Sequence, residues 1–202
     1  MLNLIKCGIG NIGSIKNALN AIGVEPNIVE SQSEINHNLK KIILPGVGSF
    51  DSFIKSLKQK GLFDEIRKLV LIKKYKILGI CVGMQSFFEE SEEGNEIGLK
   101  LIKGNLIKFK NNKNIKVPHM GWNNLDINDS RNLLTNLPKL KFYFAHSFHL
   151  TNINKENILG STTHGITFPS CINYENIYGV QFHPEKSFLQ GQQVLKNFIE
   201  KC

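Results

Sequence analysis

The stretch KILGICVGMQ (residues 76–85) decides the fold, because a short apolar run ends there in a G-x-C-x-G turn. An apolar run of this length, followed by a helical pattern, predicts a buried strand that leads into a helix. A side chain at either glycine would crowd the strained backbone of so sharp a turn. The pattern is that of a nucleophile elbow, which would present the Cys81 side chain at the end of the strand.

Apolar runs alternate with helical patterns on the N-terminal side of this stretch. The expected strands cover residues 2–7, 27–30 and 41–46, and the expected helices cover residues 14–23 and 63–74. Strands that alternate with helices favour βαβ units and a parallel sheet. We therefore expect an α/β fold with a central, mostly parallel sheet and flanking helices.

The second half of the chain has a different character. Between residues 97 and 180, short runs separated by glycine and asparagine predict antiparallel strands added to the sheet edge. Residues 187–200 have apolar side chains at helical spacing, so a closing helix is expected to cover the sheet. Its apolar face would consist of Phe188, Val194, Leu195, Phe198 and Ile199. No linker separates the halves, so one domain over residues 1–202 is expected.

Composition restricts the class of protein. The chain has 202 residues, of which 41% are hydrophobic and 21% charged, and this suits a compact fold with a sizeable core. The four cysteines are scattered without zinc-site spacing, which favours a reducing cytoplasm and no metal. The N-terminus lacks the pattern of a signal peptide, and no stretch approaches the roughly 18 apolar residues of a membrane span. Neither secretion nor membrane insertion is expected.

The net charge of +8 comes almost entirely from lysine, since Arg67 and Arg131 are the only arginines. Nucleic-acid-binding proteins usually cluster arginine and aromatic residues along one face. The one dense basic run, FKNNKNIKVPH (residues 109–119), is typical of a solvated turn or hairpin. We therefore expect no nucleic-acid partner and interpret the charge as ordinary surface charge.

His183, Pro184 and Glu185 follow the strand-like run NIYGVQF. Residues two apart on an extended segment point to the same side, so Glu185 can lie behind the His183 ring. A carboxylate on the far ring nitrogen leaves the near nitrogen to exchange protons with a sulfur and a leaving group. A helix N-terminus and a nearby imidazolium both favour the thiolate of Cys81. These residues predict a Cys-His-Glu triad.

Backbone amides at two places are candidates for an oxyanion hole. The Val82 N–H directly follows the nucleophile and would point toward the oxygen of a tetrahedral intermediate. Gly46, Val47 and Gly48 close the expected third strand, where a flexible glycine pair could bring another N–H to that oxygen. From local sequence alone, an ordinary glycine-rich strand-to-helix turn explains residues 46–48 equally well.

A competing signal lies near the N-terminus. Residues 8–13 fit the spacing G-x-G-x-x-G after a first strand, and Glu30 ends the next strand roughly where a ribose-binding acid would lie. A lone match of this kind is weak, and it explains neither the cysteine elbow nor His183. Dinucleotide binding therefore ranks behind the triad, and saturable NAD binding would favour it.

In combination, GICVGMQ (residues 79–85) and QFHPE (residues 181–185) resemble the motifs of the triad, or class I, glutamine amidotransferases. Within that family the whole chain is similar to the glutaminase subunits of imidazole glycerol phosphate synthases. Further motifs that carry the resemblance are CGIGNIGS, PGVGSF, PHMGWN, YFAHSF and QFHPEKS. The resemblance implies a flavodoxin-like class I amidotransferase fold with the site at the carboxyl ends of the strands.

The resemblance also implies a role for each matched position. Cys81 is the expected nucleophile, His183 the base and later acid, and Glu185 the orienting carboxylate. Residues 46–48 match a strand that rearranges to form the oxyanion hole. The positions matched to glutamine binding are Gly83, Gln85, Ser147 and Phe148. The positions matched to a partner-facing surface are Gly10, Asn11, Pro118, His119, Met120, Gly121 and Trp122.

The implied reaction is hydrolysis of L-glutamine to glutamate and ammonia, without a cofactor. The implied partner is a cyclase subunit with a (β/α)8 barrel, in a heterodimer that makes imidazole glycerol phosphate and aminoimidazole carboxamide ribotide for histidine biosynthesis. Alternatives are a paralogous subunit that supplies ammonia for amidination of a bacterial surface sugar, a non-catalytic scaffold, and another cysteine hydrolase with the same elbow. Three positions depart from the family pattern, namely Cys7, Val82 and Phe148, of which Phe148 lacks the hydroxyl of the more common tyrosine.

Overall fold

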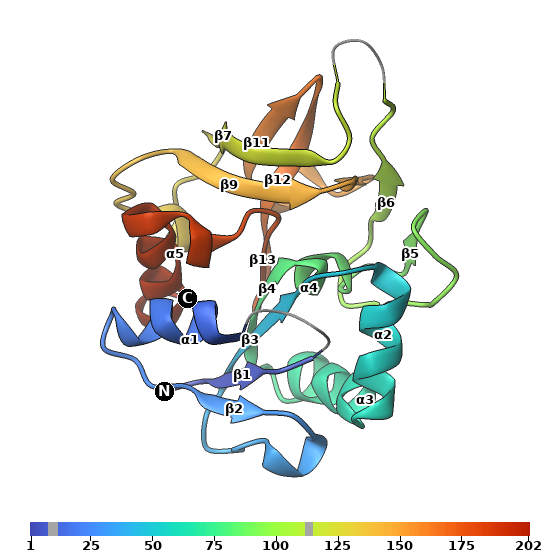
Figure 1. The fold of residues 1–202 in the computed structure, drawn as a ribbon. Helices are drawn as coiled ribbons and strands as arrows, with labels where there is room; N and C mark the ends of the chain where they lie inside the picture. The colour runs from blue at the N-terminus through green and yellow to red at the C-terminus, as the bar shows by residue number, and fades with distance from the viewer. Residues whose placement is uncertain (8–11, 112–114) are drawn as a thin grey trace.

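The structure is a computed structural model that describes residues 1–7, 12–111 and 115–202 (Figure 1). Within these ranges, eight strands form the central sheet. Their order across the sheet is β2 (Asn27–Val29), β1 (Asn3–Ile5), β3 (Lys41–Gly46), β4 (Lys76–Cys81), β13 (Ile177–Val180), β12 (Ile166–Tyr174), β11 (Ile158–His164) and β8 (Asp126–Ile127). The first five pair in parallel and the last three antiparallel. The expected α/β fold is confirmed.

Helices cover both faces of this sheet. Figure 1 shows α1 (Ile12–Asn20) and α5 (Phe188–Glu200) on one side, and α2 (Phe50–Gln59) and α3 (Leu62–Arg67) on the other. The helix expected over residues 63–74 is divided, because a wider π-helical turn (Lys68–Ile72) follows α3. The amide that closes this turn donates to the carbonyl five residues earlier, rather than four.

The closing helix α5 packs on the sheet, but the prediction for its first residue is wrong. Val194, Leu195 and Phe198 are fully buried, as expected, whereas Phe188 is 74% exposed. Phe188 has a φ of +50°, so the helical periodicity of the later residues does not extend to it. Its ring instead stacks on Trp122, with the ring centroids 5.3 Å apart and the planes 14° from parallel. This pair forms an aromatic surface outside the core.

Only part of the second half joins the edge of the central sheet. In the described residues, β5 (Glu90–Ser91), β6 (Asn105–Lys108) and β10 (Phe148–Thr151) form a small sheet of their own. Another pair, β7 (His119–Asn124) and β9 (Lys141–His146), is antiparallel. The sequence predicts strands at the edge of the central sheet between residues 97 and 180, and this prediction is wrong for β6, β7, β9 and β10, whereas β5 precedes that range. The carbonyl oxygen of Ala145 in β9 instead lies 3.8 Å from the sulfur of Cys81 at the end of β4, where the elbow begins.

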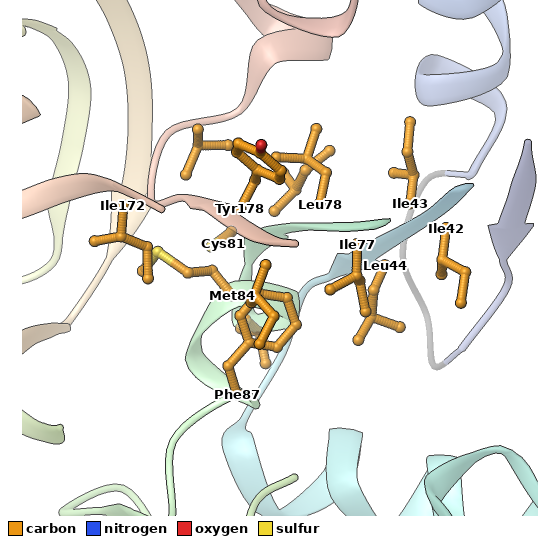
Figure 2. Close-up of a cluster of buried hydrophobic side chains, with 14 of the residues drawn as sticks. Ile42, Ile43, Leu44, Ile77, Leu78, Cys81, Met84, Phe87, Ile172 and Tyr178 are labelled. Atoms are coloured by element: carbon orange, nitrogen blue, oxygen red, sulfur yellow. The ribbon is translucent and has the colours of Figure 1, made fainter. Parts of the chain in front are cut away.

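Two paired glycines leave room for the short helix α4 (Val82–Gln85) beneath β4 and β13. Gly79 of β4 and Gly179 of β13 are register partners. A Cβ at Gly79 would lie 2.5 Å from Phe87 Cζ, and one at Gly179 would lie 2.4 Å from Met84 Cγ. Figure 2 shows Met84 and Phe87 packed together below these strands, with the Met84 sulfur close to Ile172. The crowding expected at Gly79, two residues before Cys81, is confirmed.

Candidate active site

Cys81 is the last residue of β4 and directly precedes α4. Its φ of 54° and ψ of −115° lie in a region that residues with a side chain rarely adopt. It pairs with Gly46 in the ladder between β3 and β4, so residues 46–48 begin beside it. The local geometry is that of the expected nucleophile elbow, and the surrounding strands hold the strained backbone in place.

The Cys81 sulfur is enclosed by groups from β9 and from the segment that follows β13. The residue is only 2% exposed. The sulfur lies 3.8 Å from the carbonyl oxygen of Ala145 in β9. The side-chain amide of Gln181 donates to the sulfur across 3.6 Å. Because an amide N–H can donate to either form of the sulfur, this contact suits a thiolate as well as a thiol.

His183 lies between the sulfur and a carboxylate. Its Nδ1 is 2.8 Å from Glu185 Oε1, and both side chains are buried. The carboxylate accepts this hydrogen bond, so Nδ1 carries the hydrogen and Nε2 is left for Cys81. Burial, the largest single influence, lowers the pKa of His183. The charge of Cys81, a hydrogen bond with Cys81 and the Glu185 carboxylate together outweigh burial and raise that pKa to about 10.

Backbone contacts fix the position of His183. Its amide donates to the Tyr143 carbonyl across 2.8 Å. The Ser187 hydroxyl donates to the His183 carbonyl across 2.6 Å and accepts from the Tyr143 amide across 3.0 Å. One serine therefore ties the turn after β13 to β9. The structure thus brings Cys81 together with His183 and Glu185, which follow it about a hundred residues later in the chain.

We expect a pH titration followed by NMR to place the His183 pKa near 10. Replacing Cys81 with alanine should lower this pKa substantially, because Cys81 contributes most to raising it. Since the folded-state pKa exceeds the ordinary value of 6.5, this pairing stabilises the fold fully below about pH 6.5 and less as the pH rises toward 10. Denaturant unfolding at several pH values measures this loss. A His183 pKa that is unchanged without the sulfur would contradict the assignment.

The residues matched to glutamine binding lie in α4, which begins directly after Cys81, and at the bend between β9 and β10. Gln85 in α4 is 3% exposed, and its Nε2 donates to the Phe148 carbonyl at 3.2 Å and to Gln181 Oε1 at 3.0 Å. Gly83 lies in the same helix, and Ser147 is half-buried in the bend between β9 and β10. The group of Phe148 that touches Gln85 is a main-chain oxygen. The missing hydroxyl of Phe148 therefore leaves this contact unchanged.

Gln181 is a site residue to which the sequence analysis assigned no role. It connects Gln85 to Cys81 by accepting from the first and donating to the second. A signal for it exists in the sequence, because Gln181 precedes His183 by two positions on an extended segment. Residues at that spacing point to the same side.

The residues matched to a partner surface differ in exposure. Met120 and Trp122 of β7 are 66% and 40% exposed. Pro118 is exposed and Gly121 is partly exposed, but His119 points inward and is only 4% exposed. This alternation is that of a strand with one buried face. The positions Gly10 and Asn11 lie outside the described residues.

The other three cysteines are also buried and free. Burial raises the pKa of the Cys7 and Cys171 thiols, and it raises the pKa of Cys202 to about 11. These three sulfurs therefore stay protonated at neutral pH. In the described ranges, no cluster of three or more His, Cys, Asp or Glu residues is placed to hold a metal ion. Within the same ranges, no helix has both the length and the apolar character that crossing a membrane requires.

The dinucleotide interpretation receives little support from the structure. Residues 8–11 of its glycine motif lie outside the described residues. Glu30, its candidate ribose ligand, forms an ion pair with Lys6 at 2.7 Å on the surface. The carboxylate is thus already engaged by a neighbouring strand end.

Comparisons with known proteins agree on one family. The class-I glutamine amidotransferase family matches residues 3–202. The chain is 43% identical to imidazole glycerol phosphate synthase subunit HisH 2 of Methanococcus maripaludis over the full length of both, and 38% identical to subunit HisH of Leptospira borgpetersenii over 98% of both. A crystal structure of a glutamine amidotransferase superposes with a TM-score of 0.78 at 19% identity, covering 99% of this chain and 98% of that one. The chain therefore belongs to the class-I glutamine amidotransferases and, within them, to the family of HisH subunits of imidazole glycerol phosphate synthase.

Proposed function

We propose that this chain is the glutaminase subunit of an imidazole glycerol phosphate synthase. It hydrolyses L-glutamine to glutamate and ammonia, and the synthase uses the ammonia in histidine biosynthesis. The observation that carries the proposal is the contact of Cys81 with an imidazole whose far nitrogen donates to Glu185 at 2.8 Å. The names of the relatives from Methanococcus and Leptospira support the choice of pathway.

The three side chains divide the reaction into two displacements. The Cys81 sulfur attacks the side-chain amide carbon of glutamine, so that a C–S bond forms and the carbonyl becomes an oxyanion. His183 Nε2 gives its proton to the amide nitrogen, and ammonia leaves as the C–N bond breaks. A water that loses a proton to His183 then hydrolyses the γ-glutamyl thioester, which releases glutamate and regenerates the sulfur. Glu185 holds the ring in position throughout.

Backbone groups next to the sulfur are suited to the remaining tasks. The Val82 N–H at the start of α4 stabilises the oxyanion, together with an N–H from Gly46, Val47 or Gly48. The substrate lies against the positions matched to glutamine binding. Both Nε2 hydrogens of Gln85 donate to protein groups, so its side-chain oxygen is the part that receives donors of glutamine. The reaction needs no cofactor.

The ammonia requires an acceptor that another chain provides. We assign this role to a cyclase subunit with a (β/α)8 barrel that forms a heterodimer with this chain. In the heterodimer, residues 1–202 are one glutaminase domain. The exposed Met120 and Trp122 of β7 support docking on that strand. Free thiols at all four cysteines support a reducing cytoplasm as the place of action.

Glutamate release by the purified chain is expected to be slow and to rise about 100-fold with the cyclase partner and its acceptor, which corresponds to a strong coupling between two sites. The assay compares the chain alone, with partner, with acceptor, and with both. Equal rates in all four mixtures would contradict coupling. Ammonia release from glutamine but not from peptides separates this function from that of a peptidase.

A second acceptor class is tested in the same assay. The relative from Methanococcus is named HisH 2, and this numbering is consistent with two such subunits in one organism. A synthase that amidinates a surface sugar therefore replaces the histidine-pathway cyclase in a parallel set of mixtures. Stimulation by that synthase alone would move the chain to the surface-sugar pathway and leave the glutaminase chemistry unchanged.

A further inference from the structure

A cluster of buried histidines lies beside the candidate active site and takes no part in the proposed reaction. His119, His146 and His149 are 4%, 6% and 3% exposed. They surround Phe109, and the centroid of its ring lies 4.6 to 6.3 Å from the centroids of the three imidazole rings. The prediction that residues 109–119 form a solvated turn is therefore wrong at both ends. Polar and charged residues dominate that segment, but Phe109 and His119 are buried in the core.

These histidines are neutral at physiological pH. Burial lowers the pKa of His146 to about 3, and burial together with the charge of His164 lowers the pKa of His119 to about 4. A neutral imidazole has one nitrogen that donates and one that accepts. The partners of each ring therefore determine which nitrogen carries the hydrogen.

One carbonyl oxygen determines the direction of every hydrogen bond in this network. The Phe148 oxygen can only accept, so His146 Nδ1, at 2.8 Å, carries the hydrogen. His146 Nε2 then accepts, and His119 Nδ1, at 2.9 Å across the ladder between β7 and β9, must donate. His119 Nε2 accepts in turn from the Asn123 side-chain amide at 3.0 Å.

The same oxygen determines the direction on its other side. Gln85 must present Nε2, not Oε1, to the Phe148 oxygen. Its second Nε2 hydrogen then points at Gln181 Oε1, which turns the Gln181 amide nitrogen toward the Cys81 sulfur. A continuous series of hydrogen bonds thus leads from Asn123 of β7 to Cys81.

We propose that His146 and His119 are positioning residues for the glutamine site, a role that rests on the proposed glutaminase function. The His146 side chain bonds the carbonyl two residues further along and so closes the bend that carries Ser147. This bond fixes the Phe148 oxygen, which orients the Gln85 amide. His119 holds His146 from the opposite strand. Because His119 and Asn123 belong to β7, a displacement of that strand reaches Gln85 through hydrogen bonds alone.

The first test observes the ring protons directly. Nitrogen-15 NMR of the intact wild-type chain is expected to show a hydrogen on Nδ1 and none on Nε2, for both His146 and His119 at neutral pH. A hydrogen on Nε2 of His146 would overturn the proposal, because the ring could then not donate to the Phe148 oxygen. This measurement requires no substitution and no activity.

The second test compares the rates at which two reagents label Cys81, followed by mass spectrometry of its peptide. Iodoacetamide needs only the sulfur, whereas a diazoketone analogue of glutamine also needs an ordered glutamine site. Loss of one buried hydrogen bond in His146→Ala should slow labelling by the analogue about tenfold and leave the iodoacetamide rate within about twofold. His146→Asn keeps a donor at the Nδ1 position and should restore most of the analogue rate.

His149→Ala is the matched control. His149 is equally buried, but its Nδ1 bonds the Leu150 carbonyl at 3.3 Å and leads to no site residue. The control should label with both reagents at the wild-type rates. Equal slowing in His146→Ala and His149→Ala, or none in either, would overturn the positioning role. A wild-type chain that iodoacetamide labels and the analogue does not would instead refute the glutaminase function itself.

Discussion

Replacing Cys81 with alanine is expected to lower glutaminase turnover by about 10⁴-fold or more, since the sulfur that forms the thioester is gone. The measurement is glutamate release in the presence of partner and acceptor. Thermal unfolding should remain cooperative, because the substitution removes a single sulfur atom and leaves the Cβ and the backbone of Cys81 in place. Turnover that survives in this variant would refute the assignment of the nucleophile.

A second substitution at the same position separates chemistry from strain. At the φ of 54° of Cys81, a Cβ is strained, so Cys81→Gly should be more stable than Cys81→Ala by about 1 kcal/mol. In an ordinary strand or helix the order is reversed, since glycine is less stable than alanine by roughly 0.5–1 kcal/mol. Urea unfolding of the two inactive variants decides between these orders. A less stable glycine variant would show that the elbow is relaxed.

Replacing Gly83 with alanine is expected to reduce the free energy of unfolding by about 3 kcal/mol or more, and to reduce turnover with it. The new Cβ would lie 1.8 Å from the carbonyl oxygen of Leu44 in β3. Both partners of this clash belong to the backbone, so α4 must move away from β3 to relieve it. Such a movement displaces Gln85 and the first turn after Cys81.

Gly23→Ala is the control for this substitution. Gly23 has a φ of +78°, but a Cβ there meets nothing within 4 Å. Only the backbone strain of about 1–2 kcal/mol should appear, without an effect on turnover. Urea denaturation of both variants measures the difference. Equal losses of stability would show that the packing of α4 on β3 tolerates an extra methyl group.

Much of the fold and the meeting of the three side chains could be predicted, because both depend on strong local patterns. The expected strand over residues 41–46 matches β3, and the G-x-C-x-G turn falls where β4 gives way to α4. A glycine on each side of Cys81 favours a sharp turn over a cysteine that merely fills the core. Strand pairing then carries His183, which follows β13, next to the end of β4.

What could not be predicted depends on contacts between distant segments. The rings of Phe109, His119, His146 and Phe168 come from separate segments, and no local sequence pattern in these segments indicates that the rings meet. Phe188 was assigned to the core because periodicity ignores the φ of +50° at the first residue of α5. Backbone conformation and long-range packing decide these cases.

Because three of the four thiols stay protonated at neutral pH, a fluorescent dye can be attached to one cysteine of the unaltered chain. A maleimide dye applied at neutral pH should attach at a single position, the sulfur beside the imidazole, without a cysteine-free background having to be engineered first. Because the reaction is irreversible, the rate of dye uptake then reports how readily this buried sulfur becomes accessible. A cyclase added together with the dye would report docking through a change in this labelling rate, without turnover.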